Sequence, residues 1–199
     1  CILVPLWQRL TSSLPVATAI ALVTTAITLT IAAEEPYSAV IAMGLPAVAV
    51  LSARAFRGSW LATLGVTLYL GISATFYTLF TAAAALTVVS LIALFTALYE
   101  HTWRPILRLV IMAVGSIAIA LIAWGPYVWS VMHSPVPLQT TAQHYLPEEG
   151  TQIPVPFLSL SIVGFLCLMG LIYIVIRLND AEVRALGISL IGIYLWTVA

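Results

Sequence analysis

The longest stretch of this sequence without a charged side chain runs from Gly58 to Tyr99 and contains 42 residues. As a single α-helix it would be about 63 Å long at 1.5 Å per residue, about twice the 30 Å hydrocarbon core of a bilayer. We therefore expect two membrane spans within it. The turn between them is predicted at Thr75–Phe80, where the aromatic rings of Phe76 and Tyr77 suit a membrane interface.

The composition of the 199 residues also indicates a membrane protein, because 62% are hydrophobic, 7% are charged and the mean hydropathy is +1.12. Soluble domains carry about 25% charged residues, so this chain has too few to cover a surface that faces water. At about 20 apolar residues per span, the length allows about seven transmembrane helices. We predict an all-α, polytopic transmembrane bundle, with residues 1–199 forming part of one multi-pass domain. Since the sequence begins and ends inside apolar runs, we expect a piece of a longer protein.

Charges and clusters of proline and glycine divide the rest of the chain. Residues 1–6 are typical of the end of an earlier span, and Pro46 is expected to kink the span that contains it. A long loop is predicted at about 125–156 and a short polar hairpin at 177–184. The other complete spans are predicted at Leu14–Ala33, Tyr37–Ala53, Ile106–Trp124 and Phe157–Ile176, with a last one from Ala185.

All seven basic residues are arginines, and the predicted spans place every one of them on the same side of the bilayer. The positive-inside rule assigns that side to the cytoplasm, which makes the loop at about 125–156 extracytoplasmic. A net charge of zero without a basic patch excludes a nucleic-acid partner. The seven residues are Arg9, Arg54, Arg57, Arg104, Arg108, Arg177 and Arg184.

The predicted spans contain almost no ionisable groups, which argues against an ion pump, a channel or an ion-coupled transporter. No glycine-rich phosphate-binding loop of the GxxxxGK[ST] or GxGxxG type occurs, and we predict no cofactor. Cys1 and Cys167 lie in apolar sequence without a CxxC motif. We interpret them as core-facing or lipid-facing thiols rather than as a disulfide or a metal site.

The predicted outer face carries acids and histidines but no arginine. Glu34 and Glu35 follow the first complete span. They either end a helix in a solvated turn or form a carboxylate pair in which repulsion raises one pKa toward that of a general base. Both interpretations remain open.

The loop at about 125–156 holds six of the eleven prolines, which favours an ordered loop over the membrane surface. Its carboxylates, imidazole, phenol and amide, together with an indole, would suit the hydroxyls and the apolar face of a sugar. A solvated loop explains the same residues equally well, and a metal site fits less well because the spacing matches no standard motif. The candidates are Trp129, Gln143, His144, Tyr145, Glu148 and Glu149.

Segments in the last third of the chain resemble the membrane domain of a known enzyme family. They are Trp124–Trp129, Thr141–Gln152, Leu168–Tyr173 and Val183–Gly187. They are similar to the actinobacterial galactan arabinofuranosyltransferases, which are glycosyltransferases of the GT-C type. The resemblance implies a GT-C-like fold and an enzyme of the plasma membrane. It also implies transfer of the first arabinofuranose residues from decaprenyl-phosphoryl-arabinose to cell-wall galactan on the outer face of that membrane.

On this resemblance, Glu148 or Glu149 would act as the general base toward the acceptor hydroxyl, and His144 and Tyr145 would position sugar or phosphate oxygens. Two alternatives to a glycosyltransferase stay open at this point. One is a segment of a polyprenyl-lipid flippase or small-molecule transporter, and the other is a structural membrane subunit.

The sequence departs from the family pattern in two respects. GT-C enzymes place their key carboxylate in an early outer loop, and neither Glu34 nor Glu35 matches that motif. The predicted outer face also lacks an arginine or lysine to hold a lipid phosphate. We therefore expect this chain to hold part of a catalytic site.

Overall fold

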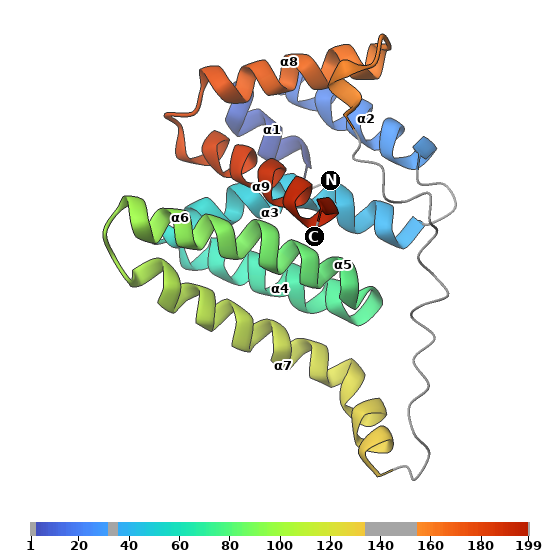
Figure 1. The fold of residues 1–199 in the computed structure, drawn as a ribbon, viewed down its shortest axis with the longest axis vertical. Coiled ribbons are helices and arrows are strands. Elements are labelled where there is room, and N and C mark those ends of the chain that lie inside the picture. Colours follow the sequence, from blue (N-terminus) through green and yellow to red (C-terminus); the bar gives the residue numbers. More distant parts are fainter. Residues whose placement is uncertain (1–2, 32–35, 134–154, 199) are drawn as a thin grey trace.

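The structure is a computed structural model that describes residues 3–31, 36–133 and 155–198 (Figure 1), and every regular element in these ranges is a helix. The predicted all-α class is thereby confirmed for the described residues. In chain order the elements are α1 (Leu3–Thr11), α2 (Leu14–Ile31), α3 (Pro36–Phe56), α4 (Trp60–Phe76), α5 (Thr78–Ala83), the π-helix η1 (Ala84–Ser90), α6 (Leu91–Tyr99), α7 (Arg104–Met132), the 3₁₀-helix η4 (Pro156–Leu158), α8 (Ile162–Ile176) and α9 (Ala181–Val198).

The long uncharged stretch folds back on itself where the sequence predicts a turn. Helix α4 ends at Phe76 and α5 begins at Thr78, so the break falls within the predicted range. Between them Tyr77 leaves the helical conformation, with φ −147° and ψ 86°. After the turn, α5, η1 and α6 follow one another without interruption. Two helical segments therefore share this stretch, and Thr81–Tyr99 is the one that is long and apolar enough to cross a membrane.

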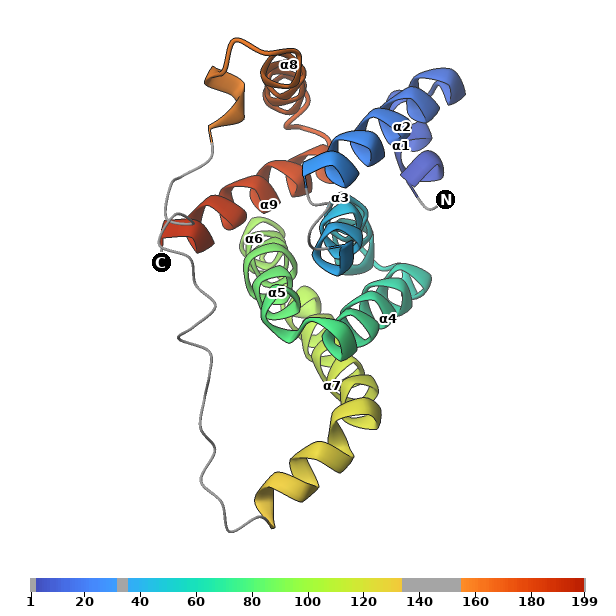
Figure 2. The same cartoon turned by 90° about the vertical axis from the view of Figure 1, so that its right-hand side faces the viewer.

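Helix α7 is longer than predicted, and the predicted start of the loop at residue 125 is wrong. Gly125 and Pro126 lie inside the helix, which continues to Met132. A proline removes one backbone hydrogen bond and pushes against the carbonyl four residues earlier, so it bends a helix without necessarily ending it. Figure 2 shows the last turns of α7 leaving the direction of the rest of the helix.

A second internal proline, Pro46, lies within α3, which continues on both sides of it. Tyr69 of α4 donates its hydroxyl to the backbone oxygen of Ile41, in the turn before this proline. The Tyr69 ring also covers Gly44, where an added Cβ would lie 2.4 Å from ring atom Cε2. The proline, the glycine and the tyrosine therefore fit together and hold α3 against α4.

Helix α3 lies at the centre of the bundle and contacts α1, α2, α4, η1, α6, α7 and α9 (Figure 2). Small residues dominate the helix contacts: Gly71 faces Ile119 and Gly115 faces Thr67, with no room for a side chain at either glycine. In a bilayer the hydrophobic effect does not drive helices together, so close approach of small residues supplies much of the packing energy. Two further small residues, Ala17 and Ala21 of α2, are buried as their spacing suggests.

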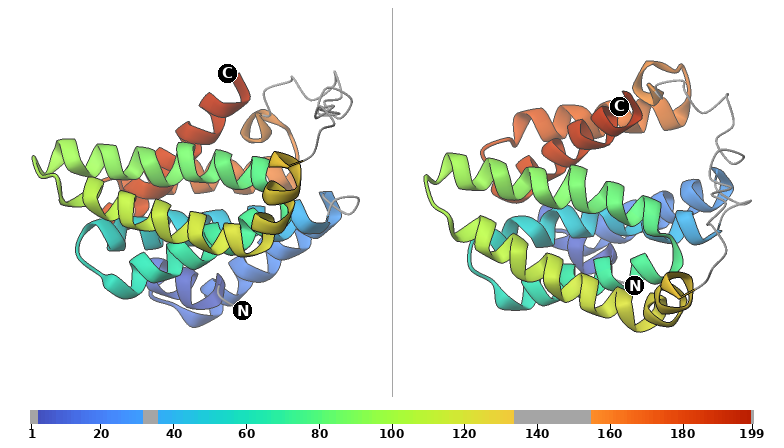
Figure 3. Two further views of the ribbon diagram at one scale, coloured as in Figure 1. Left: turned by 90° about the horizontal axis from the view of Figure 1, so that it is seen from below. Right: turned by 60° about the horizontal axis from the view of Figure 1, so that its bottom comes forward.

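Two helices among the described residues are long and apolar enough to cross a membrane, Thr81–Tyr99 and Arg104–Met132. Figure 3 shows them side by side as α5–α6 and α7. Most of the apolar surface of α7 is exposed, and only Pro105 and Met112 are buried. Four shorter apolar helices accompany them, at Leu14–Thr30, Ile41–Phe56, Trp60–Phe76 and Ile162–Ile176.

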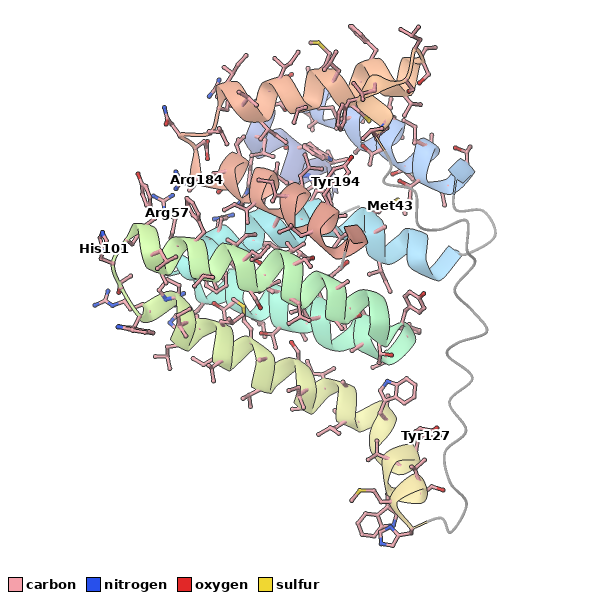
Figure 4. The ribbon with its side chains drawn as sticks, viewed as in Figure 1. Met43, Arg57, His101, Tyr127, Arg184 and Tyr194 are labelled. Carbon is pink, nitrogen blue, oxygen red and sulfur yellow. The ribbon has the colours of Figure 1, made fainter. Side chains whose placement is uncertain are left out.

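The arginines gather at one end of the bundle. Helices α1, α3 and α8 end there and α7 and α9 begin there, and each arginine lies within a turn or so of one of these helix ends. Figure 4 shows Arg57, Arg184 and His101 together at this end. The arrangement agrees with the one-sided distribution that the sequence predicts.

Candidate functional site

A groove of about 490 Å³ lies between α4, the α5–η1 run and α7. Its walls are built mainly from small side chains, among them Ala74 of α4, Ala82 and Ala85 of the α5–η1 run, and Ala113 and Ala120 of α7. Because these side chains are short, they leave space where the helix surfaces diverge. Both of the long apolar helices thus contribute to the walls of this groove.

Several of the hydroxyl groups along the groove find hydrogen-bond partners inside the protein. Thr81 Oγ1 lies 3.0 Å from Ser73 Oγ and 2.9 Å from the backbone oxygen of Tyr77, to which it donates. Ser116 of α7 donates to the backbone oxygen of Thr67 at 3.2 Å. A ligand in the groove would therefore meet a mostly apolar lining, which suits a hydrocarbon chain better than a polar molecule.

The π-helix η1 separates the groove from α9. Ala85, Leu86 and Ser90 line the groove, whereas the backbone oxygen of Thr87 faces α9, where a Cβ added to Gly192 would lie only 2.1 Å away. The hydroxyl of Ser90 donates to the oxygen of Ala85, five residues earlier, at 2.9 Å. Single π-helical turns within α-helices are frequently found at functional sites.

Aromatic side chains lie next to the end of the groove that Ala74 and Ala120 form. Trp124 Nε1 donates to the backbone oxygen of Ala74 at 2.9 Å and ties α7 to the end of α4. The Trp124 ring meets Tyr127 edge-on at 5.8 Å between centroids. Figure 4 shows Tyr127 on the bent end of α7, away from the arginines.

Trp129 lies in the same bent end and is 68% exposed. Its ring centroid is 4.3 Å from that of His133, whose Nδ1 lies 2.9 Å from the backbone oxygen of Trp129. The imidazole thus supports the indole and leaves much of it open. An exposed, supported aromatic ring of this kind can stack on the apolar face of a sugar.

Of the residues that the sequence suggests for catalysis or substrate binding, only Trp129 is among those that the structure describes. One predicted acidic segment lies between the end of α2 and the beginning of α3 in the sequence, and the other lies between the end of α7 and the beginning of η4. All four of these helix ends lie away from the arginines (Figure 1). Glu34, Glu35, Gln143, His144, Tyr145, Glu148 and Glu149 lie outside the described residues.

Sequence reasoning did not predict the groove, although its signal is visible in retrospect. Ala113, Ser116 and Ala120 recur at three- and four-residue spacing on one face of α7. Small residues at such spacing permit close contacts between helices. Ser116 does bond to α4, but the same row of small residues also forms a wall of the groove.

Comparison with known proteins decides the family. Residues 1–199 match the family described as "Arabinofuranosyltransferase N terminal". The chain belongs to this family. The resemblance seen in the last third of the sequence is therefore confirmed, and it extends over the whole chain.

Several curated relatives carry the same name, galactan 5-O-arabinofuranosyltransferase. The protein of this name from Corynebacterium glutamicum is 51% identical over 195 residues, which cover 98% of this chain and 30% of the relative. Those from Mycolicibacterium smegmatis and Mycobacterium leprae are 38% and 33% identical, over 87% and 90% of this chain and 29% and 32% of theirs. This chain thus spans about a third of the length of these relatives. The family and the two long apolar helices together indicate a membrane protein.

Proposed function

We propose that this chain is the N-terminal membrane part of a galactan arabinofuranosyltransferase. The enzyme would take arabinofuranose from decaprenyl-phosphoryl-arabinose and transfer it to cell-wall galactan on the outer face of the plasma membrane. The observation that carries this proposal is the family match over residues 1–199, together with relatives whose name states the enzyme and its acceptor.

The groove between α4, η1 and α7 supports a polyprenyl donor. A polyprenyl chain is long and apolar and has no hydrogen-bonding groups, and the groove has a mostly apolar lining. A chain lying there would reach toward Trp124 and Tyr127 with its phosphorylated end. The sugar would then lie within reach of the exposed ring of Trp129, on which its C–H face could stack.

The chemistry would come from the acids of the predicted outer loop. Glu148 or Glu149 takes the proton from the acceptor hydroxyl, the acceptor oxygen bonds to the anomeric carbon, and the bond from that carbon to the phosphate breaks. The lipid phosphate leaves with the electron pair. Gln143, His144 and Tyr145 would hold sugar or phosphate oxygens during this step.

The pair Glu34–Glu35 has a less direct role in the proposal. It lies between α2 and α3, whose facing ends are at the same end of the bundle as the bent end of α7 (Figure 1). We assign these two carboxylates to substrate binding beside Glu148 and Glu149.

The proposed architecture is a GT-C-like bundle of about seven spans. The passes are α2, α3, α4, the α5–η1–α6 run, α7, α8 and α9. The arginine-rich end would face the cytoplasm, as the positive-inside rule requires, and the end with Trp129 would face outward. This orientation puts the aromatic side chains and the predicted acids on the side where the acceptor is found.

The test is transfer of arabinose from a polyprenyl-phosphate donor to a galactan acceptor, in membranes that contain the full-length protein. The double variant Glu148→Gln, Glu149→Gln should lose roughly a hundredfold or more in rate, the scale expected for a lost general base. Glu100→Gln is the matched control, since Glu100 is exposed at the arginine-rich end. Expression of all variants is matched.

Two other outcomes have distinct meanings. Normal transfer by the double variant would support the proposed transferase activity but would show that Glu148 and Glu149 take no part in its mechanism. If the unmutated protein transferred no arabinose under conditions in which a characterised relative does, the proposed activity would be wrong, and lipid translocation would be the next assay.

A further inference from the structure

Four helices meet at the arginine-rich end and bring separate charged residues together. Helix α1 packs through Leu6 against Val50 of α3 and Leu186 of α9. The hydroxyl of Tyr173 in α8 donates to the backbone oxygen of Leu10 in α1 at 3.0 Å. The ends of α1, α3 and α8 and the start of α9 are thereby fixed to one another.

This junction carries Arg9, Arg54, Arg57 and Arg177 together with the acids Asp180 and Glu182, a set we refer to as the arginine cluster. Arg54 Nε lies 3.7 Å from Glu182 Oε1. Asp180 Oδ1 accepts the backbone N–H of Glu182 at 2.9 Å and so starts α9. Both carboxylates are therefore occupied within the fold, while four guanidinium groups leave two positive charges in excess.

The pKa of Glu182 reflects several charged groups at this junction. Burial and the neighbouring Asp180 raise the pKa of Glu182, and the positive charges of Arg9 and Arg57 act in the opposite direction. Those two arginines thus lie close enough to influence Glu182. Within the part of the chain that the structure describes, however, neither makes an ion pair or a side-chain hydrogen bond.

Helix capping does not account for the free arginines. The backbone oxygens at the end of α3 are already bound by Arg108, which donates to Ala55 and to Gly58. Arg184 lies against the rings of Phe95 and Tyr99, at 5.5 and 4.8 Å from their centroids. Arg9, Arg57 and Arg177 remain exposed and are not engaged by either arrangement.

From this geometry we infer that the arginine cluster is a binding site for the headgroup of an anionic phospholipid. Guanidinium groups form paired hydrogen bonds with phosphate oxygens, and every basic residue of this chain is an arginine. Basic sites between the ends of membrane helices are places where anionic headgroups bind. The exposed apolar side chains of α8, such as Ile172 and Ile176, adjoin the cluster and offer a surface for the acyl chains.

A lipid rather than a dissolved phosphate is the expected ligand because the cluster lies where the apolar helices end, at the depth of lipid headgroups. The inference depends on the membrane location of the chain and is independent of its transferase activity. A failure of this inference would therefore leave the proposed function unaffected, and a failure of the proposed function would leave this inference unaffected.

The test uses the full-length protein purified in detergent, with lipid binding followed by native mass spectrometry and by the shift in melting temperature. Dioleoylphosphatidylglycerol should bind and stabilise the protein, whereas dioleoylphosphatidylcholine and inorganic phosphate should not. The variant Arg9→Gln, Arg57→Gln should bind phosphatidylglycerol at least tenfold more weakly. Arg104→Gln is the control, since Arg104 is an exposed arginine at the same end but belongs to α7.

A second variant keeps the inference testable if the double variant does not fold. Arg177→Gln changes one exposed side chain just after α8 and should weaken binding severalfold. Equal binding of phosphatidylcholine, equal stabilisation by inorganic phosphate, or equal loss in the Arg104→Gln control would each overturn the inference. Unchanged binding by the variants that lack Arg9 and Arg57 or Arg177 would overturn it as well.

Discussion

Arg108 of α7 lies against Trp60 of α4, with the guanidinium carbon 4.9 Å from the centre of the indole ring. The same guanidinium donates to the backbone oxygens of Ala55 and of Gly58, the latter at 3.0 Å. Gly58 has φ +124°, a conformation that L side chains rarely adopt. One side chain from a distant helix thus holds the whole turn between α3 and α4.

Replacing Arg108 by lysine should destabilise the protein, although the charge is kept. An ammonium group cannot reach both carbonyls while it also lies flat on the indole, so at least one charge-assisted hydrogen bond is lost. We expect a loss of about 1–2 kcal/mol, measured as a lower melting temperature of the detergent-solubilised protein. Arg104→Lys, at an exposed position of the same helix, should change the melting temperature little. An equal effect of both substitutions would rule out the proposed role of Arg108 in holding the turn.

Glycine substitutions can test the contact between α9 and the π-helix. In Gly192→Ala the new Cβ would lie 2.1 Å from the backbone oxygen of Thr87, so one of the two helices must move. A cost of about 2 kcal/mol or more is expected from such overpacking. Gly170→Ala in α8 is the control, because nothing lies within 4 Å of its added Cβ and alanine favours a helix by up to about 1 kcal/mol. Comparable melting temperatures for the two variants would contradict the contact.

The raised pKa of Glu182 makes a prediction about pH. A carboxyl group whose pKa is higher in the folded protein than in the unfolded chain favours the fold most when it is protonated. Its contribution is present below the ordinary glutamate value of about 4.3 and declines as the pH rises through the raised value. Glu182→Gln should therefore be at least as stable as the unmutated protein at neutral pH, despite the lost pair with Arg54. Melting curves between about pH 4 and pH 7 would argue against this if the unmutated protein gained stability over the variant as the pH rose.

Filling the groove tests whether it holds the donor lipid of the proposed transferase. Ala113 of α7 lines the groove, and Ala113→Phe would occupy part of it. The full-length enzyme should then lose about tenfold in kcat/KM for a long polyprenyl donor, the size of effect expected from about 1.4 kcal/mol of lost binding. A donor with a short prenyl chain should be less affected. Ala123→Phe, at an exposed position of α7 outside the groove, is the control, and equal losses in both variants would exclude the groove as the donor site.

Much of the fold could be predicted from the sequence because the length and the apolar composition of membrane helices can be recognised in it. The break near Tyr77 followed from one number, the length of the uncharged stretch compared with the thickness of a bilayer. The gathering of the arginines followed from alternating the spans across the membrane. Both arguments use properties of whole segments, which do not depend on how individual side chains pack.

Errors arose where a single residue was taken to decide the local structure. Gly125 and Pro126 were interpreted as the start of a loop, but α7 continues past them. In a membrane helix the backbone groups freed by a proline can be satisfied locally, so the helix bends and goes on. The π-helix and the groove beside it were not predictable either, since they depend on how three helices diverge in space.

The contact between Gly192 and Thr87 also has a consequence for the synthesis of the chain. More than a hundred residues separate the two positions, and at about 5–20 residues per second the ribosome needs roughly 5–20 s to make them. During that time the surface of η1 that faces α9 is without its neighbour. This contact can form only after α9 has been made, so any delay between the synthesis of α7 and that of α9 prolongs the time during which this surface of η1 stays uncovered.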